Sequence, residues 1–392
     1  MPLRIPVIAA VYLPALLLAF SDGLLVPTLP LFASGLHASM GVVGLVLAAE
    51  SLGTLAGDVP AGVLLGRFGD KPVMVAGLTL VVVAVLALVT AQTVVAVILL
   101  RLVSGFGLAL WNLSRHAFLT QATRSGRRGQ AISAFGGVSR AGTFLGPAVG
   151  GLVASLFGLR SAFVVYAAVA LAALVVVAWF VPRGEAPSRP ATVAPGAVTG
   201  FRAVRGFAGV LSTAGVAQLM AQMVRAGRKV LVPLFGSQVL GLDVGAVGVI
   251  LSGSAFAEML LVYPAGWLMD RRGRKFAIVP SFLVQAAALA LVPATHGFSG
   301  LLGVALMMGL GNGLSAGTMM TLGSDLAPPE ALGEFLGVWR LVGDAGSTGG
   351  PLLVGAVADV LDLGVAAVAV AVVGLAAAAV FAYRVPETLE AV

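Results

Sequence analysis

The chain contains very long stretches without charge, the longest from residue 276 to residue 324, where Asp, Glu, Lys and Arg are all absent. About 20 apolar residues cross a bilayer as a helix, so this stretch is too long for one span. The sequence PATHGFSG near its middle is typical of the turn between two spans. A soluble domain has about 25% charged residues, whereas 10% of these 392 residues are charged and the mean hydropathy is +1.06. The chain is therefore predicted to be a polytopic membrane protein.

Apolar stretches along the whole chain predict twelve membrane helices. They begin near residues 7, 42, 72, 94, 133, 161, 208, 245, 276, 299, 334 and 364. Most Lys and Arg residues fall in segments that an even number of spans, with the N-terminus inside, places in the cytoplasm. This positive-inside bias predicts a multi-pass protein of the cell membrane with both termini cytoplasmic. The net charge of +7 is thus explained by topology, and no nucleic-acid partner is expected.

One sequence pattern occurs twice, 204 residues apart. PAGVLLGRFGDKPVM begins at residue 60, and PAGWLMDRRGRKFAI begins at residue 264. Gly146-Pro147 is matched in the same way by Gly350-Pro351. Such a repeat predicts two six-helix halves in parallel orientation. The predicted domains are residues 1–183 and 207–392, joined by a cytoplasmic linker at residues 184–206 that is rich in Pro and Arg.

With these features the chain resembles the major facilitator superfamily over essentially its whole length. GWLMDRRGRK, from Gly266 to Lys275, is similar to the loop motif between the eighth and ninth helices of that family. The first copy departs from it, since Gly66 stands where the motif has Asp and Asp70 where it has Arg, and Asp58 is a candidate for the missing carboxylate. The basic residues anchor the loops at the cytoplasmic interface, and a gating interpretation adds that the loops latch the two halves together. The residues with this predicted role are Gly62, Arg67, Gly69, Lys71, Gly266, Asp270, Arg271, Gly273, Arg274 and Lys275.

A glycine-rich string, GTFLGPAVGG, lies in the fifth predicted span. Gly142, Gly146 and Gly150 recur every four residues, which permits close helix contact, and Pro147 is expected to bend the helix. The string, which ends at Gly151, resembles the motif that marks proton-coupled antiporters within the superfamily. That resemblance favours export, although a packing seam of small residues would explain the glycines equally well.

Three charged residues of the first half are candidates for proton coupling. Asp22 in the first span and Glu50 in the second lie near the middle of the bilayer on adjacent helices. Burial favours a neutral carboxyl group and a nearby Arg favours the charged form, which is the balance that proton coupling requires. Arg101 opens RLVSGFG, which resembles the family's Arg-x-x-Gln-Gly-x-Gly element with Ser104 in place of Gln, and Asn112 shares its helix face. A purely structural ion pair is the alternative.

The seventh span carries charges of the opposite sign, and Glu258 in the eighth lies at comparable depth. The polar side chains of the seventh span are expected either to form an internal salt-bridge network or to line the cavity and contact an anionic or polar group of the substrate. The predicted cavity residues are Asn112, Gln218, Gln222, Arg225, Lys229, Glu258 and Asn312, with Arg228 close by. Spans 3, 6, 9 and 12 contain no charged residue, so they are expected to face lipid.

These features predict a secondary active transporter that exports a small amphipathic or drug-like compound, driven by protons or by Na⁺ in their place, through rocking alternating access. An enzyme is not expected, because the spans hold no Ser-His or metal constellation, and neither Cys nor a P-loop occurs. No cofactor is expected, and the predicted partners are the substrate, the driving ion and the lipid bilayer around a monomer. Proton-coupled uptake of a small organic anion or metabolite is the first alternative. A non-transporting membrane receptor is the second, although the short linker and tails offer no signalling domain.

Overall fold

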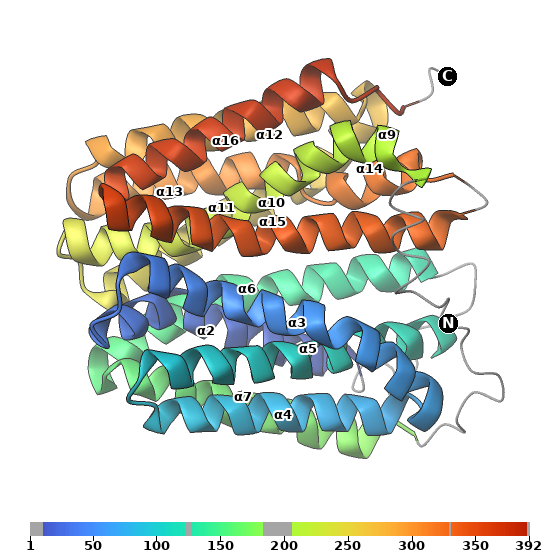
Figure 1. Ribbon diagram of the computed structural model, residues 1–392, viewed down its shortest axis with the longest axis horizontal. Coiled ribbons are helices and arrows are strands. Elements are labelled where there is room, and N and C mark those ends of the chain that lie inside the picture. Colours follow the sequence, from blue (N-terminus) through green and yellow to red (C-terminus); the bar gives the residue numbers. More distant parts are fainter. Residues whose placement is uncertain (1–10, 123–127, 183–205, 329–330, 390–392) are drawn as a thin grey trace. The chain divides into compact units, whose positions relative to one another are not determined.

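A computed structural model of the protein describes residues 11–122, 128–182, 206–328 and 331–389, and these residues form helices and no strand (Figure 1). Twelve of the described helices have 18 residues or more. They are α2 (Leu13–Gly35), α3 (Met40–Phe68), α4 (Asp70–Thr90), α5 (Val94–Ala122), α6 (Arg128–Phe157), α7 (Leu159–Phe180), α10 (Val216–Leu234), α11 (Val244–Arg272), α12 (Arg274–Leu291), α13 (Gly297–Leu314), α15 (Leu332–Val360) and α16 (Leu363–Tyr383). Short elements complete the described chain, namely α9 (Ala208–Val210), η3 (Leu211–Gly215), η4 (Phe235–Val239), η5 (Val292–Ala294) and α14 (Thr318–Leu326).

The long helices lie at the twelve places where the sequence predicts spans, so the all-helical prediction is confirmed. Some begin earlier than predicted, as α6 does at Arg128, because a helix continues past the apolar core into the interface. Ten of the described helices are long and apolar enough to cross a membrane. The other two, α10 and α15, are long enough but more polar, since α10 carries Arg225, Arg228 and Lys229 within 19 residues.

The chain divides into two compact units, one of residues 1–38 and 49–195 and the other of residues 39–48 and 196–392. The first residues of α3 are thus grouped with the second unit. The predicted division into residues 1–183 and 207–392 stays a prediction, and the predicted linker lies outside the described residues except for Gly206.

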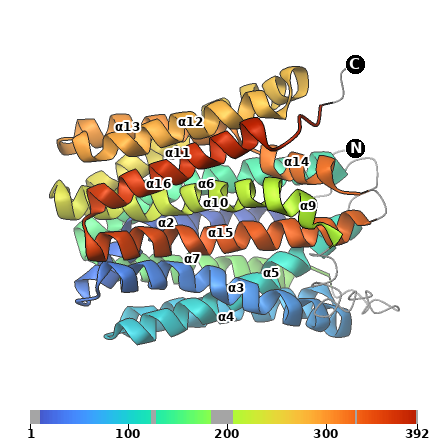
Figure 2. The same cartoon turned by 45° about the horizontal axis from the view of Figure 1, so that its top comes forward.

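Helix packing within each unit follows the sequence repeat (Figures 1 and 2). In the first unit α2 packs against α6 and α7, and α4 packs against α5 and α7; in the second, α10 packs against α15 and α16, and α12 packs against α13 and α16. Gly105 of α5 lies against the Glu50 carbonyl of α3, and Gly309 of α13 lies in the same way against the Ser254 carbonyl of α11. A Cβ atom would overlap the neighbouring backbone at both glycines. Since these two contacts are 204 positions apart, the repeat is one of packing as well as of sequence.

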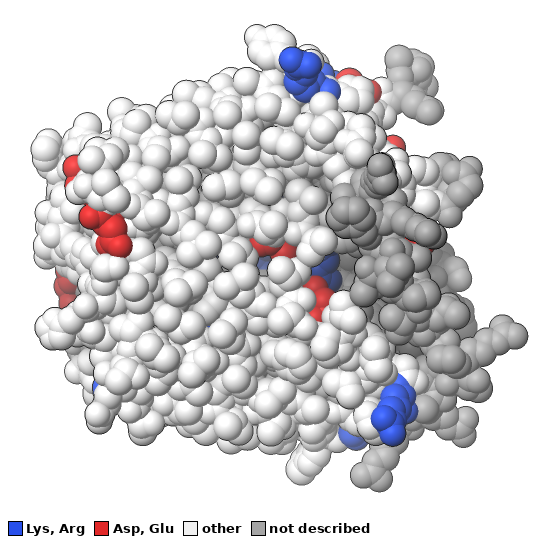
Figure 3. All heavy atoms as spheres, viewed as in Figure 1, with Lys and Arg blue, Asp and Glu red and all other residues white. Residues whose placement is uncertain are grey.

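Most of the surface in Figure 3 carries neither acidic nor basic side chains. Each of the charge-free spans exposes aliphatic side chains, for example Val83 of α4, Leu171 of α7, Leu283 of α12 and Val372 of α16. Such an exterior suits contact with lipid tails.

Candidate functional site

An ion pair joins α5 to α3 inside the first unit. Arg101 Nη1 lies 2.5 Å from Glu50 Oε2, and the side chains are only 7% and 22% exposed. The close approach at Gly105 brings the two helices within reach of each other, and the Thr54 hydroxyl donates to the Gly105 carbonyl across the same contact, at 3.1 Å. Removing two charges from water is costly unless they pair closely. The structure thus brings together two of the three predicted proton-coupling residues.

The third, Asp22, is exposed at its position on α2 and has a partner that sequence reasoning missed. The Tyr166 hydroxyl of α7 donates to Asp22 Oδ1 at 3.0 Å, and Tyr166 itself is completely buried. The charges of Asp22, Glu50 and Arg101 all act on this hydroxyl, so the four groups form one cluster, called here the acidic cluster.

Tyr166 corrects the prediction that the sixth span simply faces lipid. One face of α7 exposes aliphatic side chains, whereas the opposite face brings a phenol to the acidic cluster. Absence of charge identifies a helix that tolerates lipid, but it does not exclude a neutral polar group on the buried face. A lone Tyr within an aliphatic span was the available signal, since a buried Tyr hydroxyl usually has a hydrogen-bond partner.

The glycine face of α6 lies directly on the part of α2 that carries Asp22. A Cβ atom on Gly146 would come within 2.5 Å of the Phe20 carbonyl oxygen and 2.6 Å of Gly23 Cα. Gly142 and Gly150 meet the α2 backbone in the same manner one turn to either side, and Pro147 lies beside Gly23. The seam therefore determines how α2 sits, and with it where the Asp22 carboxylate lies.

In the second unit Arg228 pairs with Glu258. Arg228 Nη2 lies 3.0 Å from Glu258 Oε2, and Nη1 donates to the Met308 carbonyl at 3.2 Å. The Asn312 side chain also hydrogen-bonds to Glu258, so α10, α11 and α13 meet at this carboxylate. This is the internal salt bridge that the sequence offered as the alternative to a substrate-binding stripe.

Arg225, one turn before Arg228, reaches α13 instead. Its Nη2 donates to the Ser315 hydroxyl at 2.7 Å and to the Ser315 carbonyl at 3.2 Å. The Ser281 hydroxyl of α12 donates to the Ser315 hydroxyl at 2.7 Å, and the Gln285 amide donates to Ser281 at 3.2 Å. Ser281, Gln285 and Ser315 are all completely buried. Sequence reasoning missed them because residues 276–324 carry no charge, and the lipid-facing prediction for α12 holds for one face only.

The remaining predicted cavity residues lie at other positions on α5 and α10. Gln218 is buried beside Gly343 of α15, and Gln222 lies half-buried near Gly346 on the same helix, whereas Lys229 is exposed. In the described part of the chain, the hydrogen bonds and ion pairs of the acidic cluster do not include the side chain of Asn112, which lies half-buried farther along α5. The polar side chains of α10 therefore contact two sets of neighbours. Arg225 and Arg228 reach α13 and α11, whereas Gln218 and Gln222 lie against α15.

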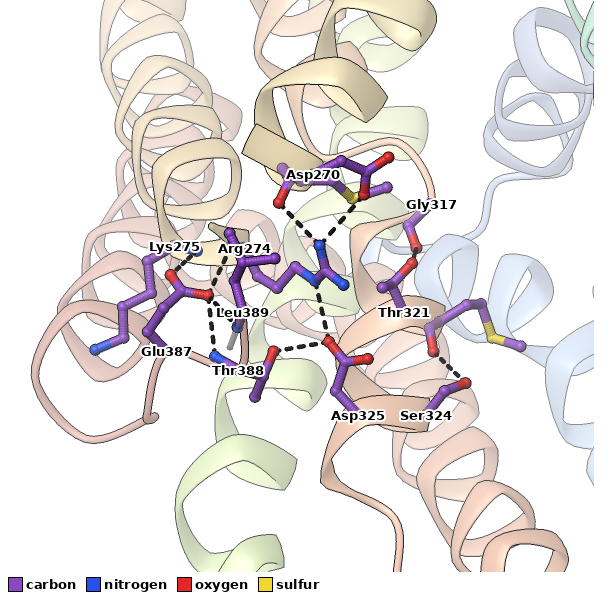
Figure 4. A network of polar contacts seen from close by, with 12 residues as sticks. Asp270, Arg274, Lys275, Gly317, Thr321, Ser324, Asp325, Glu387, Thr388 and Leu389 are labelled. Carbon is purple, nitrogen blue, oxygen red and sulfur yellow. Dashed lines mark hydrogen bonds and ion pairs between the residues drawn. The ribbon is translucent and has the colours of Figure 1, made fainter. Parts of the chain in front are cut away.

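At the end of α11 the second copy of the loop motif is held by the segment that follows α16 (Figure 4). The Glu387 carboxylate accepts hydrogen bonds from the first two backbone amides of α12, at 2.8 Å from Arg274 N and 3.0 Å from Lys275 N. Burial acts to raise the pKa of Glu387, but backbone hydrogen bonds from Lys275, Arg274, Leu389 and Thr388 together lower it below its usual value. Gly273 has φ +108° and lies so close to the carboxylate that a Cβ atom would overlap it. A glycine is therefore required at this turn.

Arg274 is at the centre of these contacts, which together with those of Glu387, Asp325 and Thr388 are called here the loop network. Its Nε lies 3.0 Å from Asp325 Oδ2 of α14, and its Nη1 lies 3.3 Å from Asp270 Oδ1 and 2.8 Å from the Met269 carbonyl. The Thr388 hydroxyl donates to the same Asp325 oxygen at 2.7 Å (Figure 4). Arg271 lies outside the network, with its guanidinium 4.8 Å from the Trp267 ring.

The first copy of the motif makes the same turn without a comparable network. Gly69 has φ +78°, as Gly273 has φ +108°. Arg67 lies over the Phe68 ring at 5.4 Å, and among the described residues neither Arg67 nor Lys71 takes part in an ion pair. The role of Asp58 as a substitute carboxylate stays a prediction. Within the described ranges, no group of three or more His, Asp or Glu residues is arranged to hold a metal ion.

Comparisons with known proteins agree with the fold. A family model described as Major Facilitator Superfamily matches residues 11–224 and 214–391. Multidrug resistance protein 1 of Bacillus subtilis (strain 168) is 24% identical over 342 residues, which are 86% of this chain and 86% of the relative. Multidrug resistance protein MdtH of Klebsiella pneumoniae (strain 342) is 24% identical over 301 residues, 76% of this chain and 73% of the relative.

Two solved structures share the fold. A bacterial homolog of the human lysosomal transporter Spinster, inward-facing and unoccupied, matches with a TM-score of 0.79 at 15% identity over 97% of this chain and 96% of its own. A mutant of the nucleoside transporter NupG matches with a TM-score of 0.76 at 16% identity over 95% of this chain and 98% of its own.

Proposed function

The chain belongs to the major facilitator superfamily, and we propose that this transporter exports small amphipathic or drug-like compounds in exchange for protons. As a member of the family it is a multi-pass membrane protein that moves a small molecule, and it is not an enzyme. The observation that carries the proposal is the acidic cluster, in which two carboxylates, an arginine and a buried phenol meet inside the first unit.

The acidic cluster has the chemistry that proton coupling needs. Asp22 is exposed and accepts a hydrogen bond from the neutral Tyr166 hydroxyl, so its carboxylate is accessible to a proton. Protonation of Glu50 would release Arg101 from its 2.5 Å contact. A proton taken up by one carboxylate changes the charge of the acidic cluster, and that change can be linked to substrate binding and release.

Export of drug-like compounds is supported by the relatives and by the glycine seam. Both relatives described above are named multidrug resistance proteins. The α6 string that resembles the antiporter motif lies against the Asp22 segment of α2. A link between proton binding at Asp22 and helix movement at the seam would make the two features parts of one device.

The alternative of anion uptake receives less support. It was favoured by Arg225, Arg228 and Lys229, but Arg228 is neutralised by Glu258 and Arg225 hydrogen-bonds to Ser315. Arg225 and Arg228 thus already have partners within the second unit.

Transport of ethidium, a fluorescent lipophilic cation, into inside-out vesicles tests the proposal. When the vesicle interior is acidic, protons leave the vesicle. An antiporter then drives ethidium inward, whereas a symporter would carry its substrate outward together with the protons. Asp22→Asn should abolish this uphill uptake but retain exchange of ethidium for ethidium, because rocking needs no net proton movement. The matched control is Asp243→Asn, at the exposed N-cap of α11, where Asn caps as well as Asp. Wild-type uphill uptake by Asp22→Asn would remove Asp22 from the mechanism.

We also propose that the protein works as a monomer in the cytoplasmic membrane with both termini in the cytoplasm, and that H⁺ rather than Na⁺ is the driving ion. Replacing Na⁺ by choline in the vesicle assay should leave ethidium uptake unchanged. Loss of uptake on Na⁺ removal would instead assign the coupling to Na⁺.

A further inference from the structure

The helix is broken between α13 and α14, although the apolar sequence there is long enough to be one membrane span. The candidate span covers Gly297–Leu326, yet α13 ends at Leu314 and α14 begins at Thr318. The amides of Ser315 and Ala316 turn back to the carbonyls of Asn312 and Gly313, at 3.2 and 3.0 Å. Gly317 has φ +81°, a conformation that only glycine adopts without strain. The interruption is therefore encoded by the sequence.

Arg225 is the side chain that holds this interruption from α10. Its two hydrogen bonds, to the Ser315 hydroxyl and carbonyl, are made where α13 has ended. The Ser315 carbonyl also accepts a hydrogen bond from the hydroxyl of Thr318, the first residue of α14, at 2.8 Å, and a cation stabilises the partial negative charge at the end of a helix. The Phe282 ring lies 5.7 Å from the guanidinium and Ser281 completes the contact from α12. Arg225 thus acts as a cap supplied by a neighbouring helix.

The other end of α14 lies in the loop network. Asp325, in the last turn of α14, binds Arg274 and Thr388 at 3.0 and 2.7 Å (Figure 4). Between the two ends, α14 rests on Trp339 of α15, whose Nε1 donates to the Met319 carbonyl at 3.0 Å and whose ring lies against Gly323. Nine helical residues extend about 13 Å. One short, rigid segment therefore connects the buried polar residues around Arg225 to the loop between α11 and α12.

We infer that α14 is a lever and that Arg225 is a positioning residue, which couples the buried polar residues of the second unit to the loop network and does not bind substrate. Displacing Arg225 from Ser315 removes one of the contacts that hold the N-terminal end of α14. Because Asp325 is on the same rigid helix, its contacts with Arg274 and Thr388 then loosen as well. This inference requires that the protein is a transporter, but not that it exports drugs or uses protons.

A buried thiol on α14 can report this coupling, since the chain has no Cys. Leu322 lies in the turn before Asp325 and is 1% exposed. In a Leu322→Cys background, the purified full-length protein is labelled with a maleimide, without substrate or pH gradient. Arg225→Gln should raise the labelling rate by about tenfold, the factor that loss of one charge-assisted hydrogen bond gives. Arg225→Lys should restore part of the protection, and Arg340→Gln on α15 is the matched control that should leave the rate unchanged.

Two outcomes would overturn the inference. If Arg225→Gln leaves labelling at position 322 unchanged, Arg225 does not position α14. If Arg225→Gln and Arg340→Gln raise the rate equally, the unit is merely less stable. Gly317→Ala supplies an independent test, since alanine is strained at φ +81°, and it should raise labelling even if an Arg225 variant does not fold. The assay contains neither drug nor gradient, so failure of the proposed export function leaves its result unaffected.

Discussion

The Tyr166 hydroxyl of α7 donates a 3.0 Å hydrogen bond to the Asp22 carboxylate of α2. These two residues are 144 positions apart in the chain, and only the packing of α7 against α2 brings them together. The hydrogen bond joins a completely buried phenol to an exposed carboxylate, so Tyr166 contacts Asp22 from the interior of the unit.

Tyr166→Phe should therefore change the pH dependence of transport more than its maximal rate. The variant removes the hydrogen bond to Asp22, so the pH profile of ethidium uptake should shift, by about one pH unit if a hydrogen bond of about 1.4 kcal/mol is lost. Tyr263→Phe, at an 85% exposed tyrosine of α11, is the matched control. An unchanged profile in Tyr166→Phe would show that the hydroxyl does not influence coupling.

Gly146→Leu should block transport without preventing insertion into the membrane. The new side chain would collide with the backbone of α2 at Phe20 and Gly23, and so displace the segment that carries Asp22. Leucine is apolar, so α6 should still insert. Gly137→Leu on the same helix is the control, because a Cβ atom there meets nothing within 4 Å. Equal transport by both variants, measured at equal expression, would contradict the role of the seam.

Replacing both Arg228 and Glu258 should destabilise the protein less than replacing either one alone. Either Arg228→Met or Glu258→Met leaves one charge poorly solvated, and we expect each to lower the free energy of unfolding by about 2 kcal/mol, discounted for the partial exposure of the pair. The double variant should recover part of that loss. Thermal unfolding of the four proteins gives the double-mutant cycle. A double variant that loses the sum of the single effects would show that the two side chains do not interact.

Glu387 should stabilise the loop network only above acidic pH. Its pKa is lowered in the folded protein, so its contribution is present above the unfolded pKa, near 4.5, and is lost as the pH falls below that value. Glu387→Gln should reduce the Tm at pH 7, and the difference from wild type should shrink as the pH falls below 4.5 and vanish below the folded pKa. The exposed Glu334 of α15 offers the control Glu334→Gln. A Tm difference that persists unchanged at pH 4 would mean that the carboxylate charge is not what stabilises the network.

The predicted orientation can be tested with two cysteines in the Cys-free chain. Ser188→Cys lies in the predicted cytoplasmic linker, and Ser299→Cys lies at the opposite side, at the start of α13. An impermeant maleimide added to intact cells should label only Ser299→Cys. The reverse pattern would invert the topology.

Much of the architecture was predictable because it depends on local properties of the chain. A helix must satisfy its own backbone in lipid, so charge-free stretches mark the spans, and all twelve places carry a long helix. The offset of 204 residues predicted a parallel repeat, and Gly105 and Gly309 make equivalent contacts in the two copies. Glu50 and Arg101 could be paired from the sequence because an isolated charge at that depth needs an opposite one.

Tertiary structure decided which neutral groups complete each cluster. Tyr166, Ser281 and Ser315 carry no charge, so the sequence offers no electrostatic reason to pair them with Asp22 or Arg225. Their roles depend on which face of α7, α12 or α13 is buried, and that is set by packing between helices far apart in the chain. The loop network follows the same principle. The sequence by itself marks Arg274 as an interfacial cation. Only the folded unit brings Asp325 and Glu387 to it. Hydrogen bonds form over about 3 Å in space, and that distance cannot be read from the separation along the chain.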